Sequence, residues 1–93
     1  GMPKAQVDDA KFAAMKKDVD AVVAKGDKKE AAAAKVQLGE AIMQTNKPPR
    51  EMYPAALALF REAIALDPEN AKAKEWFGMI EGIYKGIKRD VPQ

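Results

Sequence analysis

The chain has 93 residues, of which 47% are apolar and 32% charged, and its 16 basic and 14 acidic side chains leave a net charge of +2. This balance is typical of one small folded domain. Because the sequence contains no cysteine and no histidine, it excludes a disulfide framework, thiol catalysis, Cys/His metal sites and a Ser-His-Asp relay. Abundant alanine, with few aromatic and β-branched residues, predicts an all-α fold. A domain this short buries only about two-thirds of its unfolded surface, so we expect it to be marginally stable alone.

Basic and acidic residues are interspersed along the chain, without a basic face that carries aromatic side chains, and this pattern disfavours nucleic-acid binding. No apolar run approaches the ~20 residues that span a bilayer, so no membrane insertion is expected. Gly1 before Met2 has the form of a protease-cleavage scar. The sequence therefore predicts a cytoplasmic protein that starts at Met2, the alternative being a removed signal peptide.

The first two predicted helices are separated by Gly26. Residues 5–26 form the N-terminal helix, since apolar residues recur there at three- and four-residue spacing. These residues are Phe12, Met15, Val19, Val22 and Val23. The second helix runs to about Thr45, with Asp27 predicted as its N-cap.

Prolines mark the boundaries of the next two helices. Pro48 and Pro49 predict a loop over residues 46–50, because adjacent prolines lack N–H donors and restrict the residue before each of them. Pro54 is predicted in the first turn of the third helix, which ends near Leu66. The fourth helix is predicted over residues 68–89, with Asp67 as N-cap and Pro68 as its first residue. Such short connections predict antiparallel neighbours.

The stretch from Tyr53 to Asn70 resembles the second half of a tetratricopeptide repeat (TPR). The residues that carry the resemblance are Ala56, Phe60, Ala63 and Pro68, preceded by the pair Leu38-Gly39 and followed by the similar pair Phe77-Gly78. Lys35 and Lys74 depart from the family, because they stand where it usually has an aromatic residue.

The resemblance implies a fold for the whole chain. It implies one complete repeat, from about Ala32 to Asn70, followed by the first helix of another. Within the single domain 1–93, the helix pair of residues 27–70 is then flanked by the N-terminal and C-terminal helices. The expected architecture is a right-handed superhelical array of antiparallel helical hairpins with about four helices, and the alternative is an unrelated four-helix bundle.

In TPR proteins the first helix of each repeat lines a groove that takes peptides or partner helices. Carried onto this chain, the resemblance implies a groove lined by Val36, Gln37, Glu40, Met43, Gln44, Lys72, Glu75, Trp76, Met79 and Ile83. Family members that grip a C-terminal carboxylate use basic and amide side chains there, so Val36 and Glu40 exclude that ligand class. The apolar, methionine-bearing lining suits a hydrophobic helix or segment, or a second copy of the chain. Alternatively, Val36, Met43, Trp76 and Met79 pack against the N-terminal helix as core.

Gly78, Gly82 and Gly86 recur every four residues and place a glycine strip along the fourth predicted helix. Each glycine costs roughly 1 kcal/mol relative to alanine inside a helix. The repeat pattern accounts for Gly78, whereas Gly82 and Gly86 predict contact with a closely approaching helix from elsewhere. The alternative is a tolerated weakness near the C-terminus.

Catalysis has little support in the sequence, because pairs such as Asp18 with Asp20 and Glu75 with Glu81 stand among lysines. We therefore predict no catalytic residue, metal or cofactor. The leading hypothesis is a non-catalytic module that binds a protein or peptide partner or self-associates, either as a homodimer or with the N-terminal helix as a cap. The alternative is a structural or regulatory subunit that docks permanently into a larger assembly through its C-terminal helix.

Overall fold

The fold was analysed in a computed structural model that describes residues 4–87 and 91–92, with side chains from residue 10 onward. The described residues form helices α1 (Lys4–Ala24), α2 (Lys28–Met43), α3 (Pro49–Leu66) and α4 (Ala71–Gly86). No strand occurs in these ranges, which confirms the predicted all-α class for the described chain.

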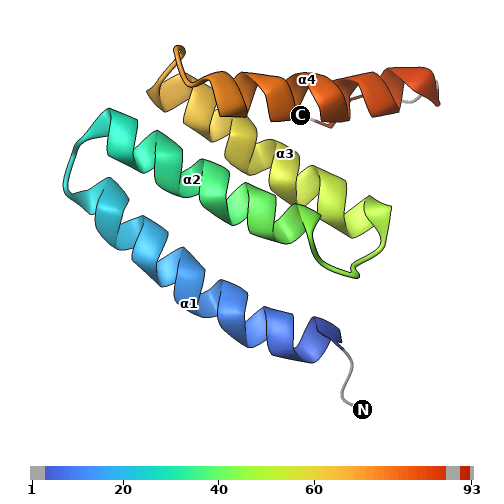
Figure 1. The fold of residues 1–93 in the computed structure, drawn as a ribbon, viewed down its shortest axis with the longest axis horizontal. Coiled ribbons are helices and arrows are strands. Elements are labelled where there is room, and N and C mark those ends of the chain that lie inside the picture. The colour runs from blue at the N-terminus through green and yellow to red at the C-terminus, as the bar shows by residue number, and fades with distance from the viewer. Residues whose placement is uncertain (1–3, 88–90, 93) are drawn as a thin grey trace.

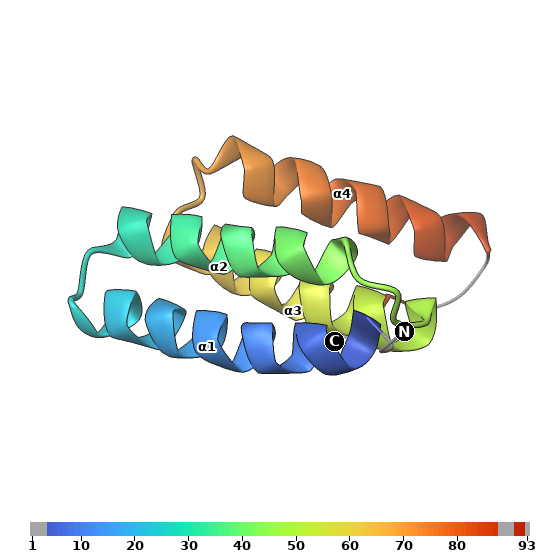
Figure 2. The same cartoon turned by 60° about the horizontal axis from the view of Figure 1, so that its bottom comes forward.

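Successive helices run in opposite directions, and α1, α2 and α3 lie side by side while α4 crosses over the α3 side of the row (Figure 1). Helix α2 is central because it contacts α1, α3 and α4, whereas α1 contacts α2 alone among the described helices. The result is a flat molecule of 36 × 36 × 18 Å. A second view shows α1 and α4 on opposite sides of α2 and α3 (Figure 2). A closed four-helix bundle, in which the first and last helices meet, is therefore not formed.

The core lies mainly between α2, α3 and α4. Phe60, Leu57 and Ile80 are its largest fully buried side chains. Ala56 and Ala63 on α3 have no exposed surface either, and they let the helices approach closely. Gly39 on α2 is needed for the same reason, since a Cβ there would lie 2.6 Å from Phe60 Cε1.

Lys35, which stands where the repeat family has an aromatic residue, forms an ion pair instead. Its Nζ lies 2.6 Å from Glu62 Oε1, so it links α2 to α3. Lys74, at the matching place on α4, is exposed. Of these two lysines, Lys35 thus contacts a neighbouring helix, whereas Lys74 faces solvent.

The α1–α2 connection agrees with the prediction. Gly26 has a positive φ of 86°, a conformation that glycine adopts without steric cost, and α1 ends just before it. Asp27 is the N-cap of α2, and the Glu30 N–H donates to its Oδ1 at 3.0 Å. Helix α2 then ends at Met43, slightly earlier than predicted.

The start of α3 differs from the prediction. Pro48 is the N-cap and Pro49 the first helical residue, so the loop covers residues 44–48 and lies two residues earlier than the predicted 46–50. Pro49 occupies the position where a missing N–H costs nothing. Pro54 consequently lies inside the helix and not in its first turn.

The prediction of Asp67 as N-cap and Pro68 as the first residue of α4 is wrong. Asp67 is the extended residue that ends α3, and its side chain accepts a hydrogen bond from the Glu69 N–H at 3.1 Å. This local bond holds Pro68 in a turn. Asn70 caps α4 instead, accepting from the Ala73 N–H at 2.9 Å. Helix α4 ends at Gly86, and the predicted end at Arg89 lies outside the described residues.

Candidate docking groove

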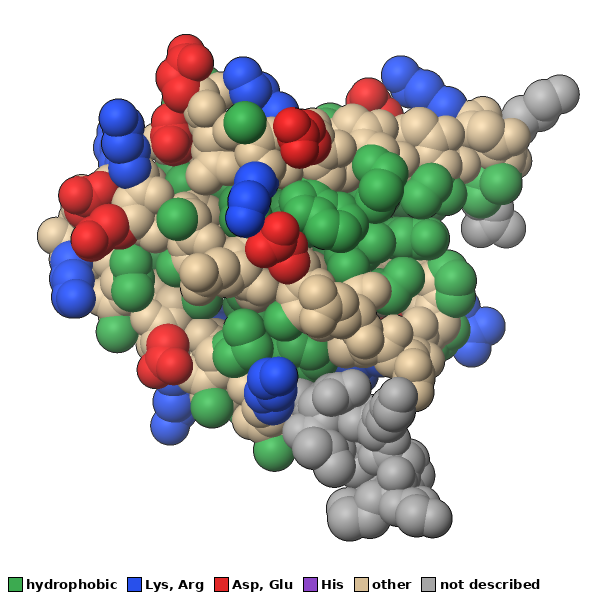
Figure 3. Space-filling model, in the orientation of Figure 1, with side chains coloured by type: hydrophobic (Ala, Val, Ile, Leu, Met, Phe, Trp, Pro, Cys, Tyr) green, Lys and Arg blue, Asp and Glu red, His purple; other side chains and the backbone are tan. Residues whose placement is uncertain are grey.

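A hollow of about 290 Å³ lies between α2 and α4. It is lined by Glu40 of α2 and by Lys72, Glu75, Trp76 and Met79 of α4, all of which belong to the groove implied by the repeat resemblance. Hydrophobic side chains gather between these two helices on the face shown in Figure 3, with acidic and basic groups beside them. The hollow therefore combines an apolar surface, formed by Trp76 and Met79, with three charged side chains.

Trp76 is fixed in this groove by contacts to two other helices. Its indole Nε1–H donates to Glu40 Oε2 at 3.0 Å. Its ring stacks on Phe60, with centroids 5.5 Å apart and an interplanar angle of 7°. Because these contacts tie Trp76 to both α2 and α3, a ligand would meet an aromatic ring that is already ordered.

Of the three other apolar residues predicted for the groove besides Val36 and Trp76, Met79 lines the hollow, whereas Met43 and Ile83 do not. Met79 is 46% exposed, whereas Met43 and Ile83 are half-buried. Met43 packs against the core. An apolar ligand in the groove would therefore contact Met79 first.

The remaining predicted residues do not line this hollow. Val36 is only 3% exposed and belongs to the core cluster with Phe60 and Ile80. Gln37 is exposed and lines a separate hollow formed with α1. Gln44 is the exposed C-cap of α2. The α2 side of the hollow thus consists of Glu40.

The N-terminal helix does not cover this groove. It makes no contact with α4, so Trp76 and Met79 do not pack against it. Val36 is indeed core, but its neighbours in the core cluster come from α2, α3 and α4. The alternative interpretation, in which α1 fills the groove, is therefore wrong for the described residues.

The glycine strip on α4 is open. Gly78, Gly82 and Gly86 are exposed, and a Cβ built at any of them meets no atom within 4 Å. The expectation that the repeat pattern explains Gly78 by close packing is therefore not met within the described chain. Gly39 on α2 does have that packing, against Phe60.

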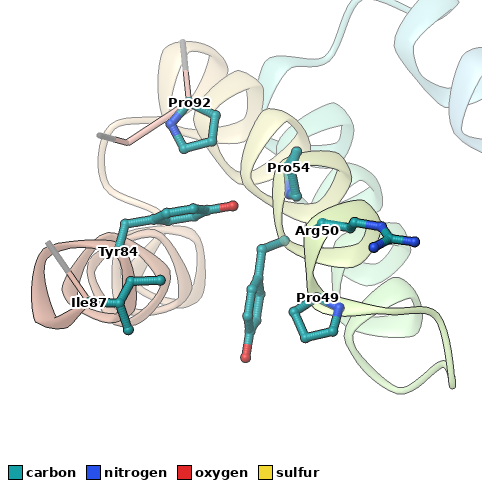
Figure 4. A pocket seen from close by; sticks show the side chains of 7 residues that line it. Pro49, Arg50, Pro54, Tyr84, Ile87 and Pro92 are labelled. Atoms are coloured by element: carbon teal, nitrogen blue, oxygen red, sulfur yellow. The ribbon is translucent and has the colours of Figure 1, made fainter. Parts of the chain in front are cut away.

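A second hollow, of about 440 Å³, lies between the start of α3 and the end of α4 (Figure 4). Its lining residues are Pro49, Arg50, Tyr53, Pro54, Tyr84, Ile87 and Pro92. Sequence reasoning missed this site. The available signal was the antiparallel connection, which brings a tyrosine near the start of α3 close to one near the end of α4.

Two further ion pairs of the described residues lie on the surface. Lys16 pairs with Asp20 at 3.3 Å, and Lys85 pairs with Glu81 at 3.7 Å. No group of three or more acidic residues in the described part of the chain is arranged to hold a metal ion. Among the described helices, none combines the length and apolarity that crossing a membrane requires.

Comparison of the chain with models of protein families, with curated proteins and with solved structures finds no match. The similarity of residues 32–70 to a tetratricopeptide repeat therefore remains a prediction from the sequence. The function has to be inferred from the groove, the second hollow and the open face of α4.

Proposed function

We propose that the chain is a non-catalytic interaction module that receives a segment of a protein or peptide partner, or a second copy of itself, in the α2–α4 groove. The observation that carries this proposal is the ordered Trp76 beside the exposed Met79, in a groove that α1 leaves uncovered. Apolar and aromatic groups that are already ordered lose little entropy on binding, so they are suited to anchor a partner.

We infer a TPR-like right-handed arrangement for the helices. The inference is supported by the contact of Gly39 with Phe60 and by the complete burial of Ala56 and Ala63, which are the packing roles that the repeat pattern gives them. It is also supported by the open row of helices, in which α2 and α4, the first helices of successive units, line one groove.

The chemistry of the groove favours an amphipathic segment as its ligand. An apolar side chain of the ligand would pack on Met79 and Trp76, while its polar side would face Glu40, Lys72 and Glu75. This is the pattern of helix-in-groove recognition, in which apolar anchors enter and charges at the rim fix the orientation. A second copy of the chain could supply such a helix.

A charge placed on the exposed Met79 tests the proposal. We expect Met79→Glu to abolish cross-linking to the partner, because a carboxylate would be desolvated in the apolar contact. Val23→Glu is the matched control, since Val23 is 36% exposed but lies on α1, away from the groove. Partner capture that is equal for wild type, Met79→Glu and Val23→Glu would exclude the α2–α4 groove as the contact.

Self-association is tested with the same variants by sedimentation velocity over a wide concentration range. If a homodimer uses the groove, wild type and Val23→Glu double their mass at high concentration and Met79→Glu stays monomeric. A wild-type chain that stays monomeric throughout would exclude the homodimer and leave a different protein as the partner.

The second candidate is a structural or regulatory subunit that docks through the glycine strip of α4. The open space around Gly82 and Gly86 favours it, because each glycine costs helix stability and the contact energy of a closely approaching helix would offset that cost. A Cβ built at either position meets no atom within 4 Å, so the two variants are expected to fold. Loss of the partner in Gly82→Leu and Gly86→Leu, with Met79→Glu unaffected, would therefore indicate docking through this strip.

A further inference from the structure

The hollow between the start of α3 and the end of α4 is a site of its own. It shares no lining residue with the α2–α4 groove. Its walls are three prolines, two tyrosines, Ile87 and Arg50. Ile87 is 60% exposed, which is the highest exposure among the large hydrophobic side chains that the structure leaves in solvent. An apolar surface of this kind is suited to bind a ligand.

The two tyrosines give the hollow both an apolar wall and polar groups. Tyr53 and Tyr84 meet edge to face, with ring centroids 6.3 Å apart and an interplanar angle of 71°. In Figure 4 the Tyr84 ring extends from α4 toward α3, across the hollow. Neither phenol hydroxyl forms a hydrogen bond within the described residues, so both can donate to backbone carbonyls of a ligand.

The described residues after α4 form part of the hollow. Val91 is half-buried against the core cluster, and Pro92 is half-buried and lines the hollow. Both residues lie outside any helix. Pro92 thus forms part of one wall of the hollow, where a ligand would meet its ring together with the two tyrosines.

Arg50 gives the hollow a preference for a negatively charged ligand. It is exposed, it lines the hollow, and its guanidinium forms no ion pair within the described residues. A guanidinium binds a carboxylate through paired hydrogen bonds. A ligand with an acidic residue next to its proline would therefore complement the site.

We propose that this hollow docks an extended, proline-containing segment of another protein, with an acidic residue next to its proline. Such a segment adopts a polyproline conformation, whose carbonyls make no internal hydrogen bonds and whose ordering on binding costs little entropy. Tyrosine faces contact the proline rings, tyrosine hydroxyls donate to the free carbonyls, and Arg50 pairs with the acid. The proposal is independent of the α2–α4 groove.

The test uses the full chain and the synthetic peptide acetyl-Glu-Asp-Val-Pro-Pro-Val-amide, with a control peptide in which alanine replaces both prolines. Amide chemical shifts are followed during titration of wild type and of Pro92→Gly, which removes one proline ring from the wall of the hollow. We expect saturable shifts around Tyr53, Tyr84 and Ile87 with the proline peptide. The alanine peptide is expected to bind at least about tenfold more weakly, since it lacks the ring contacts and the preordered backbone.

Reversal of the charge at Arg50 is the second part of the peptide-binding test. Arg50 is exposed, so Arg50→Glu should fold, which circular dichroism checks. We expect Arg50→Glu to weaken binding of the acidic peptide about two- to fivefold, as for an exposed ion pair. A peptide with two lysines in place of Glu-Asp should show the reverse preference.

Three results would overturn the proposal. One is equal binding of the proline and alanine peptides, and another is the absence of saturable shifts in both wild type and Pro92→Gly. The third is a set of shifts centred on Glu40, Trp76 and Met79, which would assign the peptide to the α2–α4 groove instead.

Discussion

Two glycines of this chain share the same local pattern and have opposite surroundings. Gly39 comes after Leu38 on α2, and a Cβ there would lie 2.6 Å from Phe60 Cε1. Gly78 comes after Phe77 on α4, and a Cβ there would meet no atom within 4 Å. A sequence pattern that permits close approach therefore does not by itself bring a helix to that place.

The difference arises from the segment of chain that comes after each glycine. Helix α3 turns back onto α2 and places the buried Phe60 against Gly39. After α4, the described residues Val91 and Pro92 lie toward the start of α3 and leave the glycine strip open. The α2–α3 pair thus forms a closed packing unit, whereas both the groove side and the glycine side of α4 are left uncovered by the described residues.

Phe60→Ala is expected to have the largest effect on stability, because it leaves a cavity between α2 and α3. Phe60 is fully buried and also supports Trp76. We expect a loss of about 3–5 kcal/mol of unfolding free energy, measured by urea denaturation. Met79→Ala, on the open side, should stay within about 0.5 kcal/mol of wild type. Comparable losses for the two variants would show that Met79 is also buried in solution.

Glu40→Ala tests the polar link between the closed pair and α4. The Trp76 indole N–H would lose its carboxylate acceptor. Since Trp76 is only half-buried, we expect a cost of about 1 kcal/mol and a shift of its fluorescence emission. Glu75→Ala, which removes an exposed carboxylate of the same hollow, is the control and should change neither quantity. An unchanged emission spectrum in Glu40→Ala would contradict the hydrogen bond.

Asn70→Ala tests where α4 begins, which sets how α4 crosses the closed pair. The variant removes the acceptor for the Ala73 N–H and should cost about 1 kcal/mol, measured by thermal or urea unfolding. Asp67→Ala is the comparison, because Asp67 bonds only within the turn before α4. A larger cost for Asp67→Ala than for Asn70→Ala would restore Asp67 as the N-cap.

The smallest expected effect concerns the ion pair between Lys35 and Glu62. A double-mutant cycle with Lys35→Ala and Glu62→Ala should give a coupling of about 0.2–1 kcal/mol, since Glu62 is largely exposed. Added salt should reduce the coupling. Lys74→Ala, on the open helix, should be almost neutral. A coupling of zero at low salt would show that the pair does not form.

The sequence predicted the structural features that are set by residues close together in the chain. The helix count, the Gly26 turn and the Asp27 cap depend on local rules and are confirmed. The burial of Ala56, Phe60 and Ala63 was predictable because their spacing places them on one face of a helix.

Other features depended on competition between equivalent local signals. Pro49 and Pro54 could each begin α3, and the earlier one does. Asp67 and Asn70 could each cap α4. The Asp67 side chain accepts from the Glu69 N–H within the turn, and Asn70 is the N-cap. No residue pattern in the sequence ranks such alternatives.

The features of the candidate site depend on how whole helices pack against one another, which the sequence does not show. Because α1 packs on α2 alone, Gln37 lines a hollow with α1 while Glu40 lines the one with α4. The hollow around Tyr53 and Tyr84 joins residues far apart in the chain, and it becomes visible only once the ends of α3 and α4 are placed together.

The most direct test of the central claim is the unfolding free energy of Gly39→Ala and of Gly78→Ala. The claim is that α2 is closed against α3 while the glycine side of α4 is open. Gly39→Ala forces a methyl group against Phe60, which is fully buried and stacked on Trp76 and therefore has no room to move. This overpacking costs about 1–3 kcal/mol and is expected to exceed the gain in helix propensity.

Gly78→Ala meets no atom and should gain the full helix propensity of alanine, about 1 kcal/mol. We therefore predict a lower unfolding free energy for Gly39→Ala and a higher one for Gly78→Ala, at the same protein concentration. A loss of stability in both variants would contradict the claim, because it would mean that the face of α4 that carries Gly78 is already covered in solution.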